Sequence, residues 1–297
     1  MALILPAYAK LNLTLDVVGR RPNGYHDIDS VMQTISLHDL LWIERTDCRV
    51  FDVIGPPIEG ENLILKAARE LEGRLSRALP FTIRLFKRVP IGAGLGGGSA
   101  DAAAFLKAAN QLYELKLQPA QLIEIATEVG QDVPFFLRGG TARATGLGSV
   151  VAPLPPIPSS RGFLVVCPPV QVATRTVYEA VDGTAVSARR TPALVEVLST
   201  PHPDPPPQGG REIALLGGGR FGERLGNDLE AVARKLFPAL DVAVERLRVA
   251  VPSMTMTGTG AAQFAVFATA HEAEAVLAAV RPLGYPAWVC RPIPAAA

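Results

Sequence analysis

The residues of this sequence best suited to chemistry lie in a glycine-rich segment, residues 90–101. Five of the seven residues from Gly92 to Gly98 are glycine, so backbone N–H groups can approach a ligand closely. We expect Ser99 to be the N-cap of a helix, because apolar residues at helical spacing follow it to about Leu112. A helix N-terminus presents unpaired N–H groups and the positive end of the helix dipole, which favour phosphate. The segment therefore predicts a phosphate-binding loop.

Two common phosphate-binding motifs match the letters of this segment but not its surroundings. The spacing Gly92-x-Gly94-x-x-Gly97 satisfies the dinucleotide-binding fingerprint. That fold requires the following helix to lead into a parallel strand with an acidic residue, whereas here a second helix is predicted at about residues 119–129. Gly98 stands where a P-loop has its lysine. A glycine loop with a purely structural role stays open as the alternative.

A lysine and an asparagine share one face of a predicted strand near the start of the chain. Residues 7–18 alternate strictly between apolar and polar, which is typical of a strand. Lys10 and Asn12 therefore project from the same face, about 7 Å apart along the strand. The simplest interpretation of such a pattern is a half-buried edge strand with a solvated polar face.

Three other side chains have residue types that could bind or react. Tyr25 and His26 end a loop rich in Pro, Asn and Gly, and they could either fill a gap at the edge of the core or stack on and hydrogen-bond a base. Asp132 precedes an apolar Val-Pro-Phe-Phe segment, so solvent is expected to be scarce around it. An aspartate in that position can cap a turn as readily as it can do chemistry.

The order of predicted elements divides the chain into two α+β domains. Residues 1–155 hold the first strands, a helix at 62–75, the glycine-rich segment and the helix pair behind it. A proline-dense stretch at 153–158 marks the boundary, and residues 156–297 predict a small antiparallel sheet with helices on one face. Residues 200–210 are of low complexity, and we expect an exposed insertion at about residues 199–222.

Composition excludes several classes of protein. The 297 residues are 48% hydrophobic with a net charge of +1, which gives no electrostatic case for nucleic acid or an anionic membrane. No apolar run reaches transmembrane length, and the short start of the chain does not match a signal peptide. The three cysteines are far apart and share no motif with the four histidines, which argues against a disulfide framework or a zinc site. We expect a soluble cytoplasmic protein.

The motifs in this order closely resemble the GHMP kinases, which hold ATP in a glycine-rich loop without a P-loop lysine. The resemblance rests on residues 6–13, 19–26, 90–100, 130–135, 227–230 and 257–260, and it leaves out mainly residues 183–226. The Gly-Tyr-His element ending at His26 and the Gly-x-Asp-Val-Pro-Phe element around Asp132 are specific to one branch. That branch is the 4-diphosphocytidyl-2-C-methyl-D-erythritol kinases of the non-mevalonate isoprenoid pathway.

This resemblance implies a two-domain GHMP kinase fold with the active site between the domains. The N-terminal domain would be like ribosomal protein S5 domain 2, and the C-terminal domain would be ferredoxin-like. The implied reaction moves the γ-phosphoryl group of ATP to the tertiary 2-hydroxyl of the cytidyl substrate. Asp132 would be the catalytic base, with Lys10 as its charged neighbour, because a base within reach removes the proton of a poor nucleophile and a nearby cation favours the ionised carboxylate.

The resemblance also implies the binding residues. The ATP site would comprise Asn62, Lys87, Pro90, Ile91, Gly92, Ala93, Gly94, Leu95, Gly96, Gly97, Gly98, Ser99 and Ala100. The substrate site would comprise Asn12, Tyr25, His26, Asp132, Thr174 and Tyr178, with the two tyrosines on opposite faces of the cytosine. Mg²⁺ is expected to be bound mainly through the phosphates, with no protein ligand assigned to it. The implied partners are ATP and the small cytidyl substrate, and the implied assembly is a monomer or weak homodimer.

Two departures and two alternatives accompany the resemblance. Ala100 stands where many relatives have a second serine, which leaves Ser99 as the only hydroxyl of the loop. Thr257 and Thr259 replace commoner serines and keep the hydroxyl groups. A homoserine or mevalonate kinase would need a different acceptor pocket, and a non-catalytic ligand sensor could share the fold.

Overall fold

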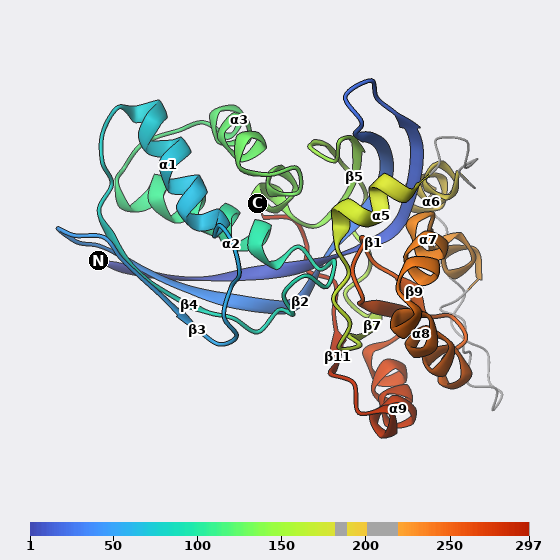
Figure 1. Ribbon diagram of the computed structural model, residues 1–297. Coiled ribbons are helices and arrows are strands. Elements are labelled where there is room, and N and C mark those ends of the chain that lie inside the picture. The colour runs from blue at the N-terminus through green and yellow to red at the C-terminus, as the bar shows by residue number, and fades with distance from the viewer. Residues whose placement is uncertain (182–188, 201–218, 297) are drawn as a thin grey trace.

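A long antiparallel hairpin runs through the whole molecule. The computed structural model describes residues 1–181, 189–200 and 219–296. Strands β1 (Ala2–Arg20) and β2 (His26–Arg45) pair along their length, with register shifts at three points. The predicted strand at 7–18 is thus longer than expected. Figure 1 shows the hairpin leaving the N-terminus and reaching into the far half of the molecule.

The two halves of the hairpin have different neighbours in a seven-stranded sheet. In the half of the hairpin that contains the N-terminus, β2 pairs with β4 (Phe81–Phe86), and β4 pairs with the parallel strand β3 (Val50–Ile54). Further along, β2 pairs with β5 (Thr141–Gly146), and β5 pairs with β6 (Val150–Pro153). A two-residue strand from the second half, β8 (Gly226–Asn227), joins β1 in parallel. The first sheet therefore takes its edge strand from beyond the predicted domain boundary.

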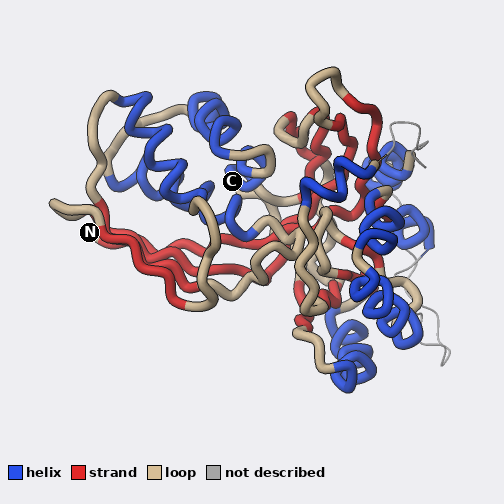
Figure 2. The backbone as a smooth tube through the Cα atoms, viewed as in Figure 1, coloured by secondary structure: helices blue, strands red, loops and turns tan. Residues whose placement is uncertain are grey.

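Four helices cover one face of the half of this sheet that contains the N-terminus (Figures 1 and 2). They are α1 (Leu63–Leu75), α2 (Gly97–Leu112), α3 (Pro119–Val129) and α4 (Val133–Arg138). Their apolar stripes and the inward side chains of the strands form one core, in which Phe81, Phe105 and Phe135 are fully buried. Helix α2 contributes six alanines to this core, which lets its backbone approach the sheet closely.

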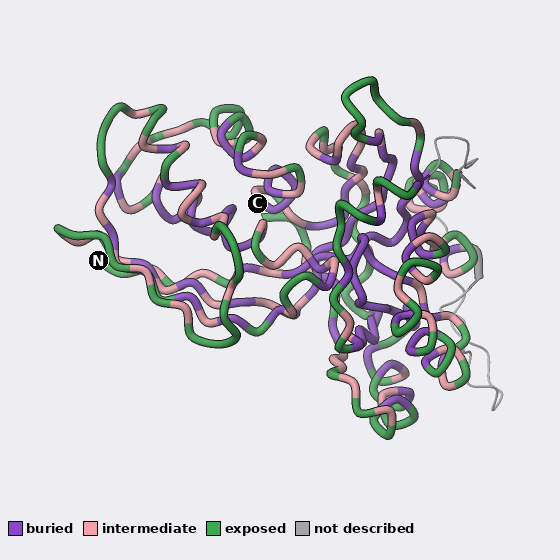
Figure 3. Tube along the Cα trace, viewed as in Figure 1, coloured by how far each residue is buried: buried purple, intermediate pink, exposed green. Residues whose placement is uncertain are grey.

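The second half contains a four-stranded antiparallel sheet, as predicted. Its order is β11 (Ala287–Cys290), β7 (Gly162–Val166), β10 (Gln263–Phe267) and β9 (Thr255–Met256). Alternate residues such as Leu164 and Phe267 pack against α8 (Pro238–Ala250) and α9 (Ala270–Val280). The opposite face, which includes Phe163 and Phe264, packs against Leu11 of the hairpin. The two sheets are thereby joined through a shared core, seen as the buried centre in Figure 3.

The remaining described elements enclose the far end of the hairpin. They are α5 (Thr174–Ala180), α6 (Arg190–Ser199), α7 (Leu229–Leu236) and the 3₁₀ turn η1 (Gly219–Arg224). A second 3₁₀ turn, η2 (Arg281–Leu283), follows α9 and contacts it. None of the helices in the described ranges is long and apolar enough to cross a membrane. Most of the low-complexity residues 200–210 and most of the predicted insertion at 199–222, namely residues 201–218, lie outside the described residues.

The interpretation of β1 as an edge strand with a solvated polar face is wrong. Lys10, Asn12 and Asp16 are 3%, 1% and 2% exposed. Asp16 accepts hydrogen bonds from the first N–H groups of α6, at Arg190 and Thr191, and so caps that helix. The polar face is buried because α6, β8 and the glycine-rich loop pack around it, which is long-range packing that strand periodicity does not report.

Candidate active site

Two glycine turns from opposite halves of the chain, residues 92–98 and residues 257–260, meet backbone to backbone beside β1. In the first turn Gly92, Gly94 and Gly96 have φ near +70°, a conformation that other residues rarely adopt. A Cβ atom on Gly94 would lie 2.3 Å from the Thr257 carbonyl oxygen, and one on Gly260 would lie 2.0 Å from the Ala93 carbonyl carbon. The glycines are therefore needed for the contact between the turns as well as for any ligand.

Helix α2 begins with free N–H groups facing a cavity of about 180 Å³. Its N-cap is Gly96, in the left-handed conformation, so the prediction of Ser99 as N-cap is wrong. The first intrahelical bond in the turn runs from the Ala100 N–H to the Gly96 oxygen at 2.9 Å, and no side chain caps the helix. The N–H groups of the first turn are left for a ligand because Gly96 ends the loop without offering an acceptor side chain.

Most residues predicted to bind ATP surround this cavity. The lining includes Asn62, Lys87 and the loop from Pro90 to Gly98. Asn62 is also the N-cap of α1, where its side chain accepts a hydrogen bond from the Ile64 N–H at 2.8 Å. Ala100 does not reach the cavity, since it is buried in the core behind the loop.

Lys87 is held by two buried carboxylates that were not predicted from the sequence. Its ammonium group donates to Asp101 of α2 at 2.8 Å and to Asp39 of β2. All three side chains are almost fully buried. Burial raises the pKa of Asp101 to about 7, against the opposing effect of the Lys87 ammonium. The only sequence signal for Asp101 is its position one helical turn after Gly97, while nothing marks Asp39.

A larger cavity of about 760 Å³ lies on the other side of the loop. Lys10 and Asp132 meet in it, with the Lys10 nitrogen 3.6 Å from one carboxylate oxygen of Asp132. Lys10 also donates a hydrogen bond to the Asn12 side chain. Asn12 is fixed in turn, because its amide nitrogen donates to Ser30 at 2.8 Å and its backbone N–H donates to Thr257 at 2.8 Å. Through Asn12, strand β2 and the turn that contains Thr257 thus orient the buried Lys10 ammonium toward the Asp132 carboxylate.

Asp132 stands at the start of α4, a short helix that was not predicted. It occupies the N-cap position, yet its side chain makes no capping hydrogen bond. Its carboxylate is about one third exposed and borders the cavity. The Phe136 ring of the same helix packs where a side chain on Gly96 would be, at 2.7 Å from the Cβ position. The helix therefore fixes Asp132 relative to the glycine loop.

The far end of the cavity contains aromatic and hydroxyl side chains from both halves of the chain. His26 and Tyr178 are stacked, with ring centroids 5.7 Å apart and planes inclined by 30°. His26 is 5% exposed, and neither ring nitrogen has a hydrogen-bond partner. Burial, followed by the Asp132 charge, raises the pKa of Tyr178. Thr174 shares a hydrogen bond of 2.7 Å with Thr259 of the second glycine turn.

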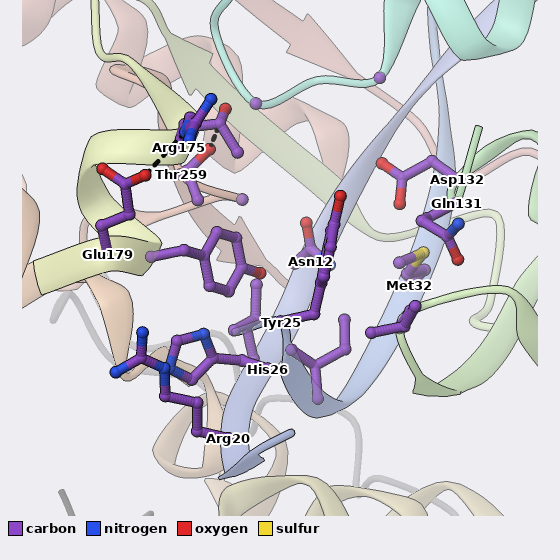
Figure 4. A pocket seen from close by; sticks show the side chains of 18 of the residues that line it. Asn12, Arg20, Tyr25, His26, Met32, Gln131, Asp132, Arg175, Glu179 and Thr259 are labelled. Carbon is purple, nitrogen blue, oxygen red and sulfur yellow. Dashed lines mark hydrogen bonds and ion pairs between the residues drawn. The ribbon is translucent and has the colours of Figure 1, made fainter. Parts of the chain in front are cut away.

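Tyr25 is 62% exposed and points into the open part of the cavity (Figure 4). The same view shows Asp132 on the side opposite Arg175 and Glu179 of α5. All six residues predicted for the substrate site line this one cavity: Asn12, Tyr25, His26, Asp132, Thr174 and Tyr178. Arg20, Asn23 and Arg175 also line it and were not predicted. The stack that forms is His26 on Tyr178, and the expected placement of the two tyrosines about a base stays a prediction.

Comparison with known proteins matches both halves of the chain. Family models described as "GHMP kinases N terminal domain" and "GHMP kinases C terminal" match residues 62–140 and 213–285. A 4-diphosphocytidyl-2-C-methyl-D-erythritol kinase of Ralstonia nicotianae is 39% identical over 275 residues, covering 91% of this chain and 87% of that protein. One of Caldanaerobacter subterraneus subsp. tengcongensis is 38% identical, covering 90% and 88%.

Solved structures give the same result for the fold. A crystal structure of 4-(cytidine 5'-diphospho)-2C-methyl-D-erythritol kinase has a TM-score of 0.76 and 31% identity, covering 98% of this chain and 99% of that one. Homoserine kinase from Cytophaga hutchinsonii has a TM-score of 0.68 at 17% identity, covering 99% and 95%. The second likeness concerns the fold alone.

Proposed function

Because the chain belongs to the 4-diphosphocytidyl-2-C-methyl-D-erythritol kinases of the GHMP kinase family, we propose that it transfers the γ-phosphoryl group of ATP to the 2-hydroxyl of that cytidyl substrate. The observation that carries the proposal is the Lys10–Asp132 pair, 3.6 Å apart, beside a glycine loop that opens on two cavities. One cavity suits a nucleotide, and the other is large enough for a cytidyl substrate.

In this proposal Asp132 accepts the proton of the 2-hydroxyl as the oxygen attacks the γ-phosphorus. The new O–P bond forms while the bond to the β-phosphate oxygen breaks, and ADP leaves. The Lys10 ammonium, 3.6 Å from Asp132, offsets negative charge on the transferring group. Asn12 supports this role because it accepts a hydrogen bond from Lys10 and is itself anchored by Ser30 and Thr257.

The nucleotide is proposed to lie with its phosphates over the start of α2. The unused N–H groups of Gly97, Gly98 and Ser99 and the helix dipole suit phosphate oxygens. Mg²⁺ bound to the phosphates would neutralise part of their charge. Within the described residues no group of three His, Cys, Asp or Glu side chains could hold a metal ion.

The acceptor is proposed to enter with its cytosine at the aromatic end of the cavity. The two unpaired nitrogens of buried His26 suit polar groups on a base edge, and Tyr25 is free to stack on the ring. Homoserine and mevalonate carry no base for these side chains, so the homoserine-type and mevalonate-type alternatives leave them without a role. A ligand sensor would have no need of the Lys10–Asp132 pair.

We also propose a cellular location and an assembly for the enzyme. A net charge of +1 and the absence of membrane-spanning helices among the described residues suit an enzyme of the cytoplasm that binds small molecules only. We propose that it acts as a monomer or weak homodimer with residues 1–155 and 156–297 as its two domains, and sedimentation velocity tests the assembly.

The experiment that tests the function is ADP release with ATP, Mg²⁺ and 4-diphosphocytidyl-2-C-methyl-D-erythritol. Phosphorus NMR of the product should show one new phosphomonoester, coupled to no second phosphorus, while the diphosphate of the substrate stays intact. Binding of both ligands without turnover would favour the sensor.

A further inference from the structure

The buried group around Lys87 contains one oxygen with no partner. Asp39 uses both oxygens, since one accepts from the N–H groups of Arg88 and Val89 at 2.5 and 2.8 Å and the other accepts from Lys87. Asp101 uses only one oxygen, toward Lys87 at 2.8 Å. Its other oxygen is buried and makes no hydrogen bond to any described residue, and the residue as a whole is only 2% exposed. A carboxylate oxygen left in this state is costly, which calls for a partner that arrives from outside.

The position of Asp101 on α2 directs its carboxyl group to the phosphate end of the helix. Side chains on a helix lean toward its N-terminus, so the Asp101 side chain lies over the turn that contains Gly97 and Gly98. Those two residues have no side chains to cover it, and all three line the 180 Å³ cavity. Asp101 therefore borders the same cavity as the N–H groups to which we assign the nucleotide phosphates.

The charges around Asp101 decide in which form it can face a phosphate. Asp39 faces it from β2 and Lys87 faces it from the segment after β4. Glu61, before α1, lines the same cavity but is exposed and paired with Arg69. With Asp39 and Asp101 both ionised, the single Lys87 ammonium leaves one net negative charge beside the phosphates. A protonated Asp101 removes that charge and gains an O–H donor.

We propose that Asp101 is a further nucleotide-binding residue, whose carboxyl group binds in its protonated form and donates a hydrogen bond to a phosphate oxygen. The inference rests on the proposed function, because it needs a nucleotide over the first turn of α2. Burial raises the pKa of Asp101 to about 7, so the protonated form is accessible near neutral pH. As pH rises above 7 the donor is lost and a negative charge appears, so nucleotide affinity should fall.

The test is the Kd of ADP, measured by titration calorimetry without acceptor at pH 6 and pH 8. Because ADP also titrates in this range, the quantity compared is the ratio of wild-type Kd to Asp101→Asn Kd at each pH. The amide keeps a donor and cannot ionise, so we expect Kd values within about threefold at pH 6. At pH 8 the wild type should bind about tenfold more weakly than the variant, the scale of one hydrogen bond to a charged group.

Two further variants make the outcome decisive. Glu61→Gln removes an exposed carboxylate of the same cavity and should leave the wild-type pH dependence unchanged. If Asp101→Asn fails to fold, Asp101→Ser removes the titrating group with a smaller side chain, and the ratio of wild-type Kd to Asp101→Ser Kd should likewise rise from pH 6 to pH 8. A constant ratio from pH 6 to pH 8, or tighter wild-type binding at pH 8, overturns the role of Asp101 alone. Absence of ADP binding at any pH would overturn the proposed function as well.

Discussion

Replacing Asp132 by asparagine should separate its chemistry from its place in the fold. The two side chains are nearly isosteric, and Asp132 makes no capping hydrogen bond at the start of α4. Lys10 keeps its hydrogen bond to Asn12 in the variant. We therefore expect Asp132→Asn to fold, with a melting temperature close to that of the parent and an unchanged Kd for ADP.

The expected loss is in turnover. An amide cannot accept the proton of the 2-hydroxyl, and it no longer offers a negative charge 3.6 Å from the Lys10 ammonium. General-base catalysis contributes about 10²–10⁴ in rate, so kcat should fall by at least about 100-fold, or about 2.7 kcal/mol in the barrier. The KM of the cytidyl substrate should change little, because shape and hydrogen-bonding atoms are nearly conserved.

Steady-state ADP release at saturating ATP measures this effect. Asp241→Asn is a matched control, since it removes a half-exposed carboxylate on α8 whose partner is Arg234, far from both cavities. The control should keep kcat within about twofold. Near wild-type kcat in Asp132→Asn would remove Asp132 from the mechanism.

Three further changes probe the substrate pocket, the glycine contact and the insertion. Tyr25→Ala should raise the Kd of the cytidyl substrate about tenfold, the scale of one stacked base, and leave the Kd of ADP unchanged; the reverse pattern would mean that the two cavities are assigned the wrong way round. Gly260→Ala places a Cβ 2.0 Å from the backbone of Ala93, so thermal unfolding should show that the free energy of unfolding falls by about 2 kcal/mol or more. The control Gly73→Ala in α1, where a Cβ would have nothing within 4 Å, should not destabilise the protein. Shortening residues 201–210, of which five are proline, should leave activity and melting temperature unchanged, because loop length alters closure entropy only weakly; a marked loss of either would make the stretch a packed or functional element.

The parts of the fold that sequence predicted well have strong local signals. Strand alternation placed Lys10 and Asn12 on one face, and the helix predicted at about residues 119–129 is α3. The predictions were wrong where contacts between segments distant in the sequence determine the structure. Packing by α6, β8 and the glycine-rich loop buries a face that looks solvated from its pattern. Gly96 replaces Ser99 as N-cap because the loop reaches the helix in a left-handed conformation that only its geometry reveals.

The residues of the candidate site also differ in whether the sequence carries a signal for them. Motif residues such as Asp132 and His26 could be assigned because a family resemblance carries their roles. Asp39 and Asp101 have no such signal, since β2 and α2 bring them to Lys87 across 48 and 14 residues of sequence. Arg175 of α5 reaches the cavity only through the meeting of the two halves.

The central claim is that the two cavities unite ATP with a cytidyl acceptor. The most direct measurement is kcat/KM for ADP release with four acceptors at equal concentration: 4-diphosphocytidyl-2-C-methyl-D-erythritol, methylerythritol phosphate, homoserine and mevalonate. We predict that the cytidyl substrate is preferred by at least about 100-fold, because the other three leave the polar groups of buried His26 unpaired. Equal kcat/KM for any of the other three acceptors would contradict the claim.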